Sequence, residues 1–131
     1  MSDEPTSLVL DASAMVDLLT GAGETVQIRE RLVNSTVHVP AHFDAEVLSA
    51  IGRLASAGKL TGDEVSAFLK ALQGAPFARH LLPDLLEGAW SRRENLRLVD
   101  AFYVELAERL HAPLLTTDTR LSQAYAKAQT P

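Results

Sequence analysis

Apolar residues along the chain form short continuous runs that alternate with stretches of helical spacing. Near the N-terminus the run Leu8-Val9-Leu10 ends abruptly at Asp11 and passes into the helical pattern of residues 14–19. A short apolar run followed by an amphipathic helix is typical of a buried parallel strand. The pattern therefore predicts a strand that carries Asp11 at its C-terminal end, where open α/β sheets bind ligands.

The same alternation continues to the end of the chain. Further strands are expected at residues 36–39, more weakly at 77–82, and at 113–116. Helices are expected at residues 13–20, 24–33, 41–57, 61–74, 85–93, 98–111 and 119–127. After Ala126 no closing strand is predicted.

Several helix ends carry recognisable signals. Ser13 is expected to cap the first helix, and Gly21 to end it. Pro40 is expected to end a strand and open the next helix. Thr61 and Glu64 match the capping box, in which each side chain binds a backbone N–H of the first helical turn.

Strands separated by helices, with connections long enough for crossovers, predict an α/β fold with a mostly parallel sheet of four to five strands and helices on both faces. A length of 131 residues fits one domain, expected to span residues 1–131 with a flexible N-terminus at 1–6.

Composition narrows the class of protein. No apolar run approaches the roughly 20 residues of a membrane span, and Asp3 and Glu4 stand where a signal peptide would be basic. We therefore expect a soluble, cytoplasmic protein without membrane contact. The absence of cysteine excludes disulfides, thiolate nucleophiles and cysteine-ligated zinc.

A formal net charge of −5 argues against a protein that holds nucleic acid by a broad basic surface. The arginines nevertheless gather locally, at Arg92, Arg93 and Arg97, with Arg79 and His80 not far upstream. A solvated helix face is the favoured interpretation, and a local phosphate-binding patch is the alternative.

Four acids stand at positions where a site would form. Asp11 and Asp118 each follow a strand, Asp100 lies in a first helical turn, and Glu46 borders the buried face of its helix. Singly, each aspartate has a structural explanation as a cap or a partner of the helix dipole. If the strands before Asp11 and Asp118 are neighbours, all four carboxylates meet at one edge of the sheet.

Carboxylates crowded together raise one another's pKa unless a cation neutralises them. Mg²⁺ is the natural partner, because it prefers oxygen ligands and is usually held by few carboxylates together with substrate phosphate. Such a site can activate water for phosphodiester hydrolysis.

Other polar and aromatic residues receive no role in this site. The histidines lack metal-ligand spacing and are expected at the surface or in caps. The large aromatic residues Trp90, Tyr103 and Tyr125 are expected in the core or an interface. Ordinary exposed helix charges are expected at Asp17, Asp44 and Glu105.

The chain resembles the PIN domain, and more narrowly the VapC-type toxin ribonucleases of bacterial toxin–antitoxin pairs. The resemblance depends on four stretches in order: Leu8 to Ser13, Glu46, Arg92 to Asn95 leading to Asp100 to Ala107, and Leu114 to Asp118. It implies that Asp11, Glu46, Asp100 and Asp118 bind Mg²⁺ or Mn²⁺, and that metal-activated water hydrolyses RNA. It also implies that the hydroxyls of Ser13 and Thr116 orient carboxylates or bound water.

The resemblance further implies a homodimer and a cognate antitoxin, whose basic tail would occupy the acidic groove. Three departures from the family pattern stand out: Arg97 where relatives often have a small hydroxyl residue, Val99 where they often have tyrosine, and no evident last strand. A catalytically silent PIN-like interaction module is the main alternative. A receiver-type signalling domain is disfavoured, because each lysine lies in or beside a helical stretch.

Overall fold

A computed structural model describes residues 6–131, and within this range five parallel strands form one sheet in the order β3-β2-β1-β4-β5. The strands are β1 (Thr6–Leu10), β2 (Ser35–Pro40), β3 (Ala78–His80), β4 (Leu114–Leu115) and β5 (Ala128–Gln129). The predicted α/β class with a mostly parallel sheet is confirmed. The expected flexible segment 1–6 falls outside the described residues except for Thr6, which begins β1.

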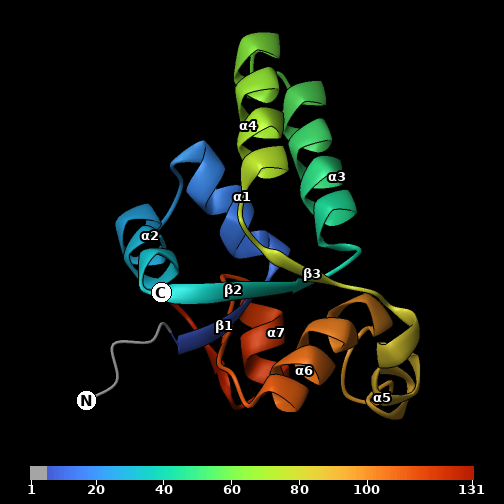
Figure 1. Cartoon of the computed structure of the whole chain (residues 1–131). Helices are drawn as coiled ribbons and strands as arrows, with labels where there is room; N and C mark the ends of the chain where they lie inside the picture. The colour runs from blue at the N-terminus through green and yellow to red at the C-terminus, as the bar shows by residue number, and fades with distance from the viewer. Residues whose placement is uncertain (1–5) are drawn as a thin grey trace.

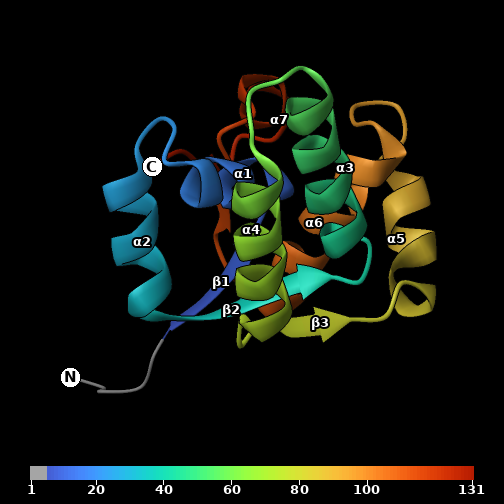
Figure 2. The ribbon, with the colours of Figure 1, turned by 90° about the horizontal axis from the view of Figure 1, so that it is seen from above.

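Helices cover both faces of the sheet (Figures 1 and 2). They are α1 (Ala12–Thr20), α2 (Thr25–Val33), α3 (Phe43–Ser56), α4 (Gly62–Gly74), α5 (Leu86–Ser91), α6 (Leu98–Leu110) and α7 (Thr119–Ala124), with a 3₁₀ turn at Pro83–Leu85. Figure 1 shows α1 to α4 on one side of the sheet, with α3 and α4 projecting as a hairpin, and α5 to α7 on the other.

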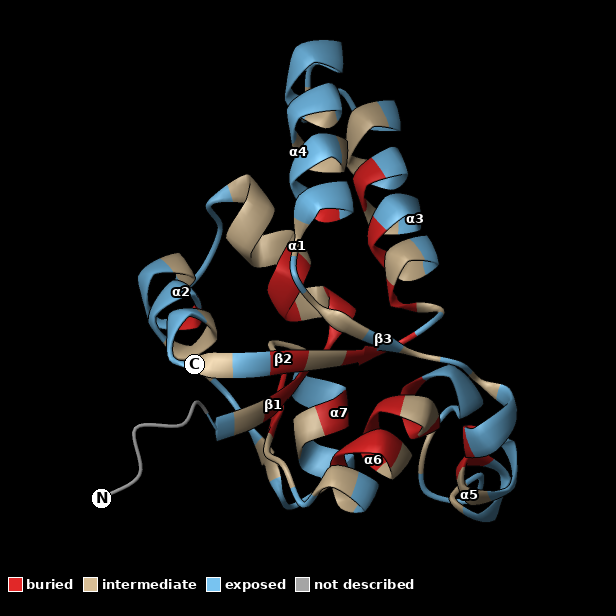
Figure 3. Ribbon diagram, in the orientation of Figure 1, coloured by how far each residue is buried: buried red, intermediate tan, exposed pale blue. Residues whose placement is uncertain are grey.

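The core lies on both faces of the central strands (Figure 3). Leu8, Val9 and Leu10 of β1 and both residues of β4 are at most 1% exposed. This accounts for the continuous apolar runs in the sequence, because a parallel strand covered by helices on both sides has no solvent face. The described helices include none long and apolar enough to cross a lipid bilayer.

The chain order places a topological switch point at β1. The first three strands extend to one side of β1, and β4 and β5 are added on the other. Connections therefore leave β1 and β4 in opposite directions, and a crevice opens beyond their C-terminal ends. Asp11 follows β1 and Thr116 follows β4, so both stand at the mouth of this crevice.

Several predicted boundaries are confirmed and others are wrong. The Thr61 capping box and the αL residue Gly21 after α1 are present. Ser13 does not cap α1, because Asp11 holds the N-cap position. Pro40 ends β2 but does not open α3, whose N-cap residue is His42.

The C-terminal strand is the main correction. Ala128 and Gln129 form β5, which pairs in parallel with β4, although no strand was predicted after Ala126. Consequently α7 ends at Ala124, earlier than expected. A two-residue strand is too short to show any periodicity, and its pairing with β4 supplies what its sequence does not.

Candidate active site

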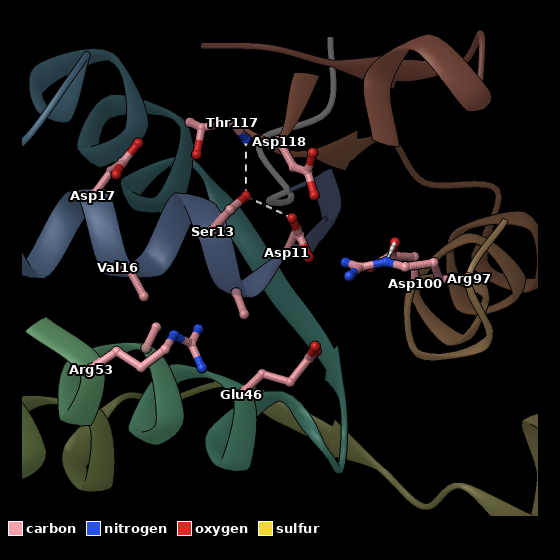
Figure 4. A pocket seen from close by; sticks show the side chains of 12 residues that line it. Asp11, Ser13, Val16, Asp17, Glu46, Arg53, Arg97, Asp100, Thr117 and Asp118 are labelled. Carbon is pink, nitrogen blue, oxygen red and sulfur yellow. Dashed lines mark hydrogen bonds and ion pairs between the residues drawn. The ribbon is translucent and has the colours of Figure 1, made fainter. Parts of the chain in front are cut away.

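Asp11 is the centre of the site, and its carboxylate is fixed through one oxygen. Oδ2 accepts hydrogen bonds from Ser13 Oγ at 2.6 Å and from Thr116 Oγ1 at 2.7 Å. Although Asp11 is the N-cap residue of α1, its side chain makes no capping hydrogen bond. The second oxygen, Oδ1, is therefore the one available to the pocket that Asp11 lines (Figure 4).

Ser13 and Thr116 join the ends of β1 and β4 into one polar network. Their hydroxyl oxygens lie 3.2 Å apart. The backbone N–H of Thr117 donates to Ser13 Oγ, and that of Asp118 donates to Thr116 Oγ1. Each hydroxyl thus accepts a hydrogen bond from the β4–α7 loop and donates one to Asp11. These hydrogen bonds fix the loop after β4 relative to the end of β1.

The two carboxylate oxygens of Asp118 make different contacts. Oδ1 accepts from the backbone N–H groups of Arg120 and Leu121, so it caps α7. Oδ2 accepts from the guanidinium of Arg120 at 3.1 Å. The expectation that Asp118 caps a helix is therefore confirmed for Oδ1, whereas Oδ2 contacts the guanidinium of Arg120.

Asp100 lies in the first turn of α6 and is only 5% exposed. Arg97 binds it with two N–H groups, Nε to Oδ2 at 3.0 Å and Nη2 to Oδ1 at 3.3 Å. Nη2 of Arg120 lies 3.6 Å from Asp100 Oδ2 and 3.1 Å from Asp118 Oδ2. One cationic group therefore already contacts carboxylates from both α6 and the β4–α7 loop.

Glu46 enters the pocket from α3, on the opposite side. Its Oε1 accepts from the Tyr103 hydroxyl at 2.6 Å and lies 3.3 Å from His42 Nε2. The same ring nitrogen is 2.8 Å from the carbonyl oxygen of Val99. Because both neighbours are acceptors, His42 carries a proton on Nε2.

Burial and mutual repulsion act on these carboxylates together. Burial is the main cause that raises the pKa of Asp11; the hydrogen bonds from Ser13 and Thr116 oppose it, and the charges of Asp100 and Asp118 add to it. Burial likewise raises the pKa of Glu46, against the hydrogen bond from Tyr103 and the nearby His42. The site is therefore arranged to gain from a cation.

The predicted acids line a single pocket of about 390 Å³ (Figure 4). Its wall includes Asp11, Ser13, Glu46, Arg97, Asp100 and Asp118. Thr116 lies behind Asp11 and is fully buried. Asp17, expected to be an ordinary surface charge, also lines this pocket.

The donor chemistry fits a hard divalent ion. The pocket offers carboxylate oxygens, the ligands that Mg²⁺ and Mn²⁺ prefer. Across residues 6–131, no three acidic or imidazole side chains already form a metal cage. Mg²⁺ commonly retains waters and uses few carboxylates, so a partial set is compatible with it.

Other residues at the site were not identified from the sequence as its members. Tyr103, expected in the core or an interface, is buried, and His42, expected at the surface or in a cap, holds the N-cap position of α3. Both also contact Glu46, which the sequence did not indicate. The sequence gives no signal for Arg120, because the pattern of residues in a helical turn does not show that its side chain contacts both Asp100 and Asp118. The sequence did single out Arg97, because it stands where relatives often have a small hydroxyl residue.

Three of the four arginines considered from the sequence as a local phosphate-binding patch are paired with acids. Arg79 pairs with Asp44, Arg92 with Glu105, and Arg97 with Asp100. The Arg93 guanidinium lies over the Trp90 ring, 4.5 Å from its centre.

The PIN domain family model matches residues 8–127. Ribonuclease VapC3 of Mycobacterium tuberculosis is 54% identical over 125 residues, covering 95% of this chain and 91% of that protein. Ribonuclease VapC12 of the same species is 36% identical over 118 residues, covering 90% and 92%.

A solved structure gives the same fold. The crystal structure of PAE2754 from Pyrobaculum aerophilum superposes with a TM-score of 0.68 at 22% identity, covering 99% of this chain and 92% of that one. The family match also excludes the receiver-type alternative. The chain therefore belongs to the PIN domain family and, within it, to the VapC-type proteins.

Proposed function

We propose that this protein is an endoribonuclease, the toxin of a toxin–antitoxin pair, and that it hydrolyses RNA phosphodiester bonds with Mg²⁺ or Mn²⁺. The observation that carries the proposal is the shared pocket in which Asp11 keeps one oxygen free beside Asp100 and Asp118. The names of the relatives at 54% and 36% identity support ribonuclease activity.

The residues of the site divide into acids that would hold the metal and hydroxyl groups that position those acids. Asp11, Asp100, Asp118 and Glu46 would hold the metal, through oxygens that neither Ser13 and Thr116 nor the α7 cap occupies. When bound, the metal supplies Lewis acidity that activates water and offsets charge at the phosphate. Ser13 and Thr116 keep the Asp11 carboxylate from rotating, and Tyr103 does the same for Glu46.

Arg53 provides a candidate contact for the RNA backbone. It lies on the exposed side of α3 and lines the pocket on the side away from Arg97 (Figure 4). Within residues 6–131 it forms no ion pair, so its charge is available to a ligand. An RNA strand crossing the acids would find a cation on each side, which suits local contact in a protein of negative net charge.

The partners are part of the same proposal. A cognate antitoxin with a basic segment would complement the acidic pocket. The homodimer stays a prediction, supported by the exposed apolar side chains of Leu81, Leu86 and Trp90 in and before α5. A silent interaction module would bind such partners without cleaving RNA.

The test is cleavage of mixed single-stranded RNA by the purified, antitoxin-free protein with Mg²⁺ or Mn²⁺. EDTA should abolish cleavage, and Asp11→Asn or Asp100→Asn should lower its rate at least about 100-fold. Asp84→Asn is the matched control, because Asp84 is an exposed acid outside the pocket. Metal binding without turnover on any RNA, in wild type and variants alike, would favour the silent module instead.

A further inference from the structure

Two arginines already occupy carboxylate oxygens that a metal would need. Arg97 uses two N–H groups on Asp100, at 3.0 and 3.3 Å. Arg120 lies 3.1 Å from Asp118 Oδ2 and 3.6 Å from Asp100 Oδ2. Both oxygens of Asp100 and the pocket-facing oxygen of Asp118 therefore face guanidinium groups.

The arginines are the movable partners in these pairs. Each arginine side chain is 55% exposed, whereas that of Asp100 is 8% and that of Asp118 is 26% exposed. Arg97 holds the N-cap position of α6 but makes no side-chain capping bond. The cap of α7 uses the backbone N–H of Arg120, not its guanidinium. Neither helix depends on its arginine side chain for capping, so outward movement of either side chain breaks only its ion pairs with the acids.

A divalent ion would compete directly with these groups. Mg²⁺ binds carboxylate oxygens at about 2.0–2.1 Å, much closer than the N–H groups now present. The two kinds of cation cannot occupy the same oxygens together. Metal entry would therefore displace guanidinium groups, and the displaced groups would remain at the rim of the pocket.

The rim is where the RNA backbone would arrive. Arg97 lines the acidic pocket, and Arg97 and Arg120 together line a smaller adjacent cavity of about 130 Å³. A guanidinium released from a carboxylate has the planar donor pair that binds a phosphate in the same manner.

We propose that Arg97 and Arg120 are exchangeable counter-cations: they neutralise Asp100 and Asp118 in the metal-free protein, leave them when a divalent ion binds, and then contact RNA phosphates. The inference depends on the proposed function, since it requires metal and RNA at this pocket. It assigns Arg97 and Arg120 as residues that contact RNA and leaves the proposed metal-holding acids unchanged.

The first measurement is Mn²⁺ affinity by calorimetry for wild type, Arg97→Gln and Arg120→Gln. Glutamine keeps a polar end group on a shorter side chain but removes the charge. Because the competing cation is gone, each variant should bind Mn²⁺ roughly two- to fivefold more tightly. Arg109→Gln is the matched control, since Arg109 pairs with Glu105 on α6 and does not line the pocket. Its Mn²⁺ affinity should equal that of wild type.

The second measurement is binding of an oligonucleotide of ten deoxythymidines, which carries the phosphates without the 2′-hydroxyl groups. In wild type, Mn²⁺ should strengthen this binding at least about fivefold. In Arg97→Gln and Arg120→Gln, binding in the presence of Mn²⁺ should be about three- to tenfold weaker than in wild type. A merely structural role would not tighten the metal and weaken the oligonucleotide in one variant.

The outcomes separate this inference from the function on which it depends. Unchanged or weaker Mn²⁺ binding in both arginine variants, with wild type still cleaving RNA, would overturn the exchange alone. Tighter Mn²⁺ binding with unchanged oligonucleotide affinity would overturn the phosphate contact. Absence of Mn²⁺ binding in wild type would overturn the metal site and the exchange together.

Discussion

Asp11 combines firm positioning with an unfavourable charge. Two hydroxyl groups hold it, yet burial raises its pKa above the ordinary value of 3.8, and Asp100 and Asp118 raise it further. A group whose pKa is raised on folding adds stability below its unfolded pKa, and loses that contribution as the pH rises through its folded pKa. Above the unfolded pKa, Asp11 therefore makes the metal-free protein less stable.

Asp11→Asn should accordingly stabilise the metal-free protein at pH 7, while abolishing cleavage. A gain of about 1 kcal/mol would raise the melting temperature by roughly 4 °C. The gain should shrink as the pH is lowered toward the pKa of Asp11, because wild type then becomes protonated too. Urea unfolding of both proteins in EDTA at several pH values measures this. A variant less stable than wild type at pH 7 would mean that the contacts of Ser13 and Thr116 outweigh burial.

Among the elements, helices α5 and α6 approach each other closely at Gly88. A Cβ on Gly88 of α5 would collide with the carboxylate of Glu105 on α6. The Glu105 side chain is only 12% exposed and pairs with Arg92 and Arg109. The sequence-based expectation of an exposed helix charge at Glu105 is therefore wrong. Helix spacing alone cannot show that another helix covers that face.

Gly88→Ala should destabilise the protein by about 1–3 kcal/mol, because Glu105 must move away from its arginines. Gly52→Ala in α3 is the matched control, since a Cβ there meets no atom within 4 Å. It should stabilise the protein by about 0.5–1 kcal/mol through higher helix propensity. Chemical denaturation of the two variants measures both effects, and equal effects would show that Gly88 has no packing role.

At the scale of the whole molecule, the C-terminal strand supports the site from behind. The backbone N–H of Thr116 donates to the Gln129 carbonyl at 3.0 Å, while the Thr116 hydroxyl binds Asp11. The Gln129 side chain also accepts from Arg31 of α2. This agrees with Figure 1, where the C-terminus lies beside α2. The last strand thus links α2, β4 and the buried aspartate.

Removal of residues 128–131 should therefore lower stability and RNA cleavage together, because β4 becomes an edge strand and Thr116 loses its backbone partner. We expect a loss of at least about 1–2 kcal/mol. Gln129→Ala is the control, since it keeps the strand and removes only the contact with Arg31. Cleavage equal to wild type in the truncated protein would show that β5 does not support the site.

Much of the fold was predictable because its signals are local. The apolar run at Leu8 to Leu10, the capping box at Thr61 and the glycine after α1 each act through neighbours a few residues away. Strands alternating with helices indicated a mostly parallel sheet. That β1 and β4 are neighbours, so that Asp11 and Asp118 follow adjacent strands, was only a condition in the sequence analysis and is shown by the structure.

Local patterns along the chain were enough to predict the α/β class, the order of most elements and four candidate acids, since periodicity and strand ends depend on residues that are close in sequence. Tertiary contacts were needed to place Arg97 and Arg120 on those acids, to bring Tyr103 and His42 to Glu46, and to form a strand from Ala128 and Gln129. Those contacts join residues far apart in sequence or depend on the direction of long side chains, and no local pattern encodes either.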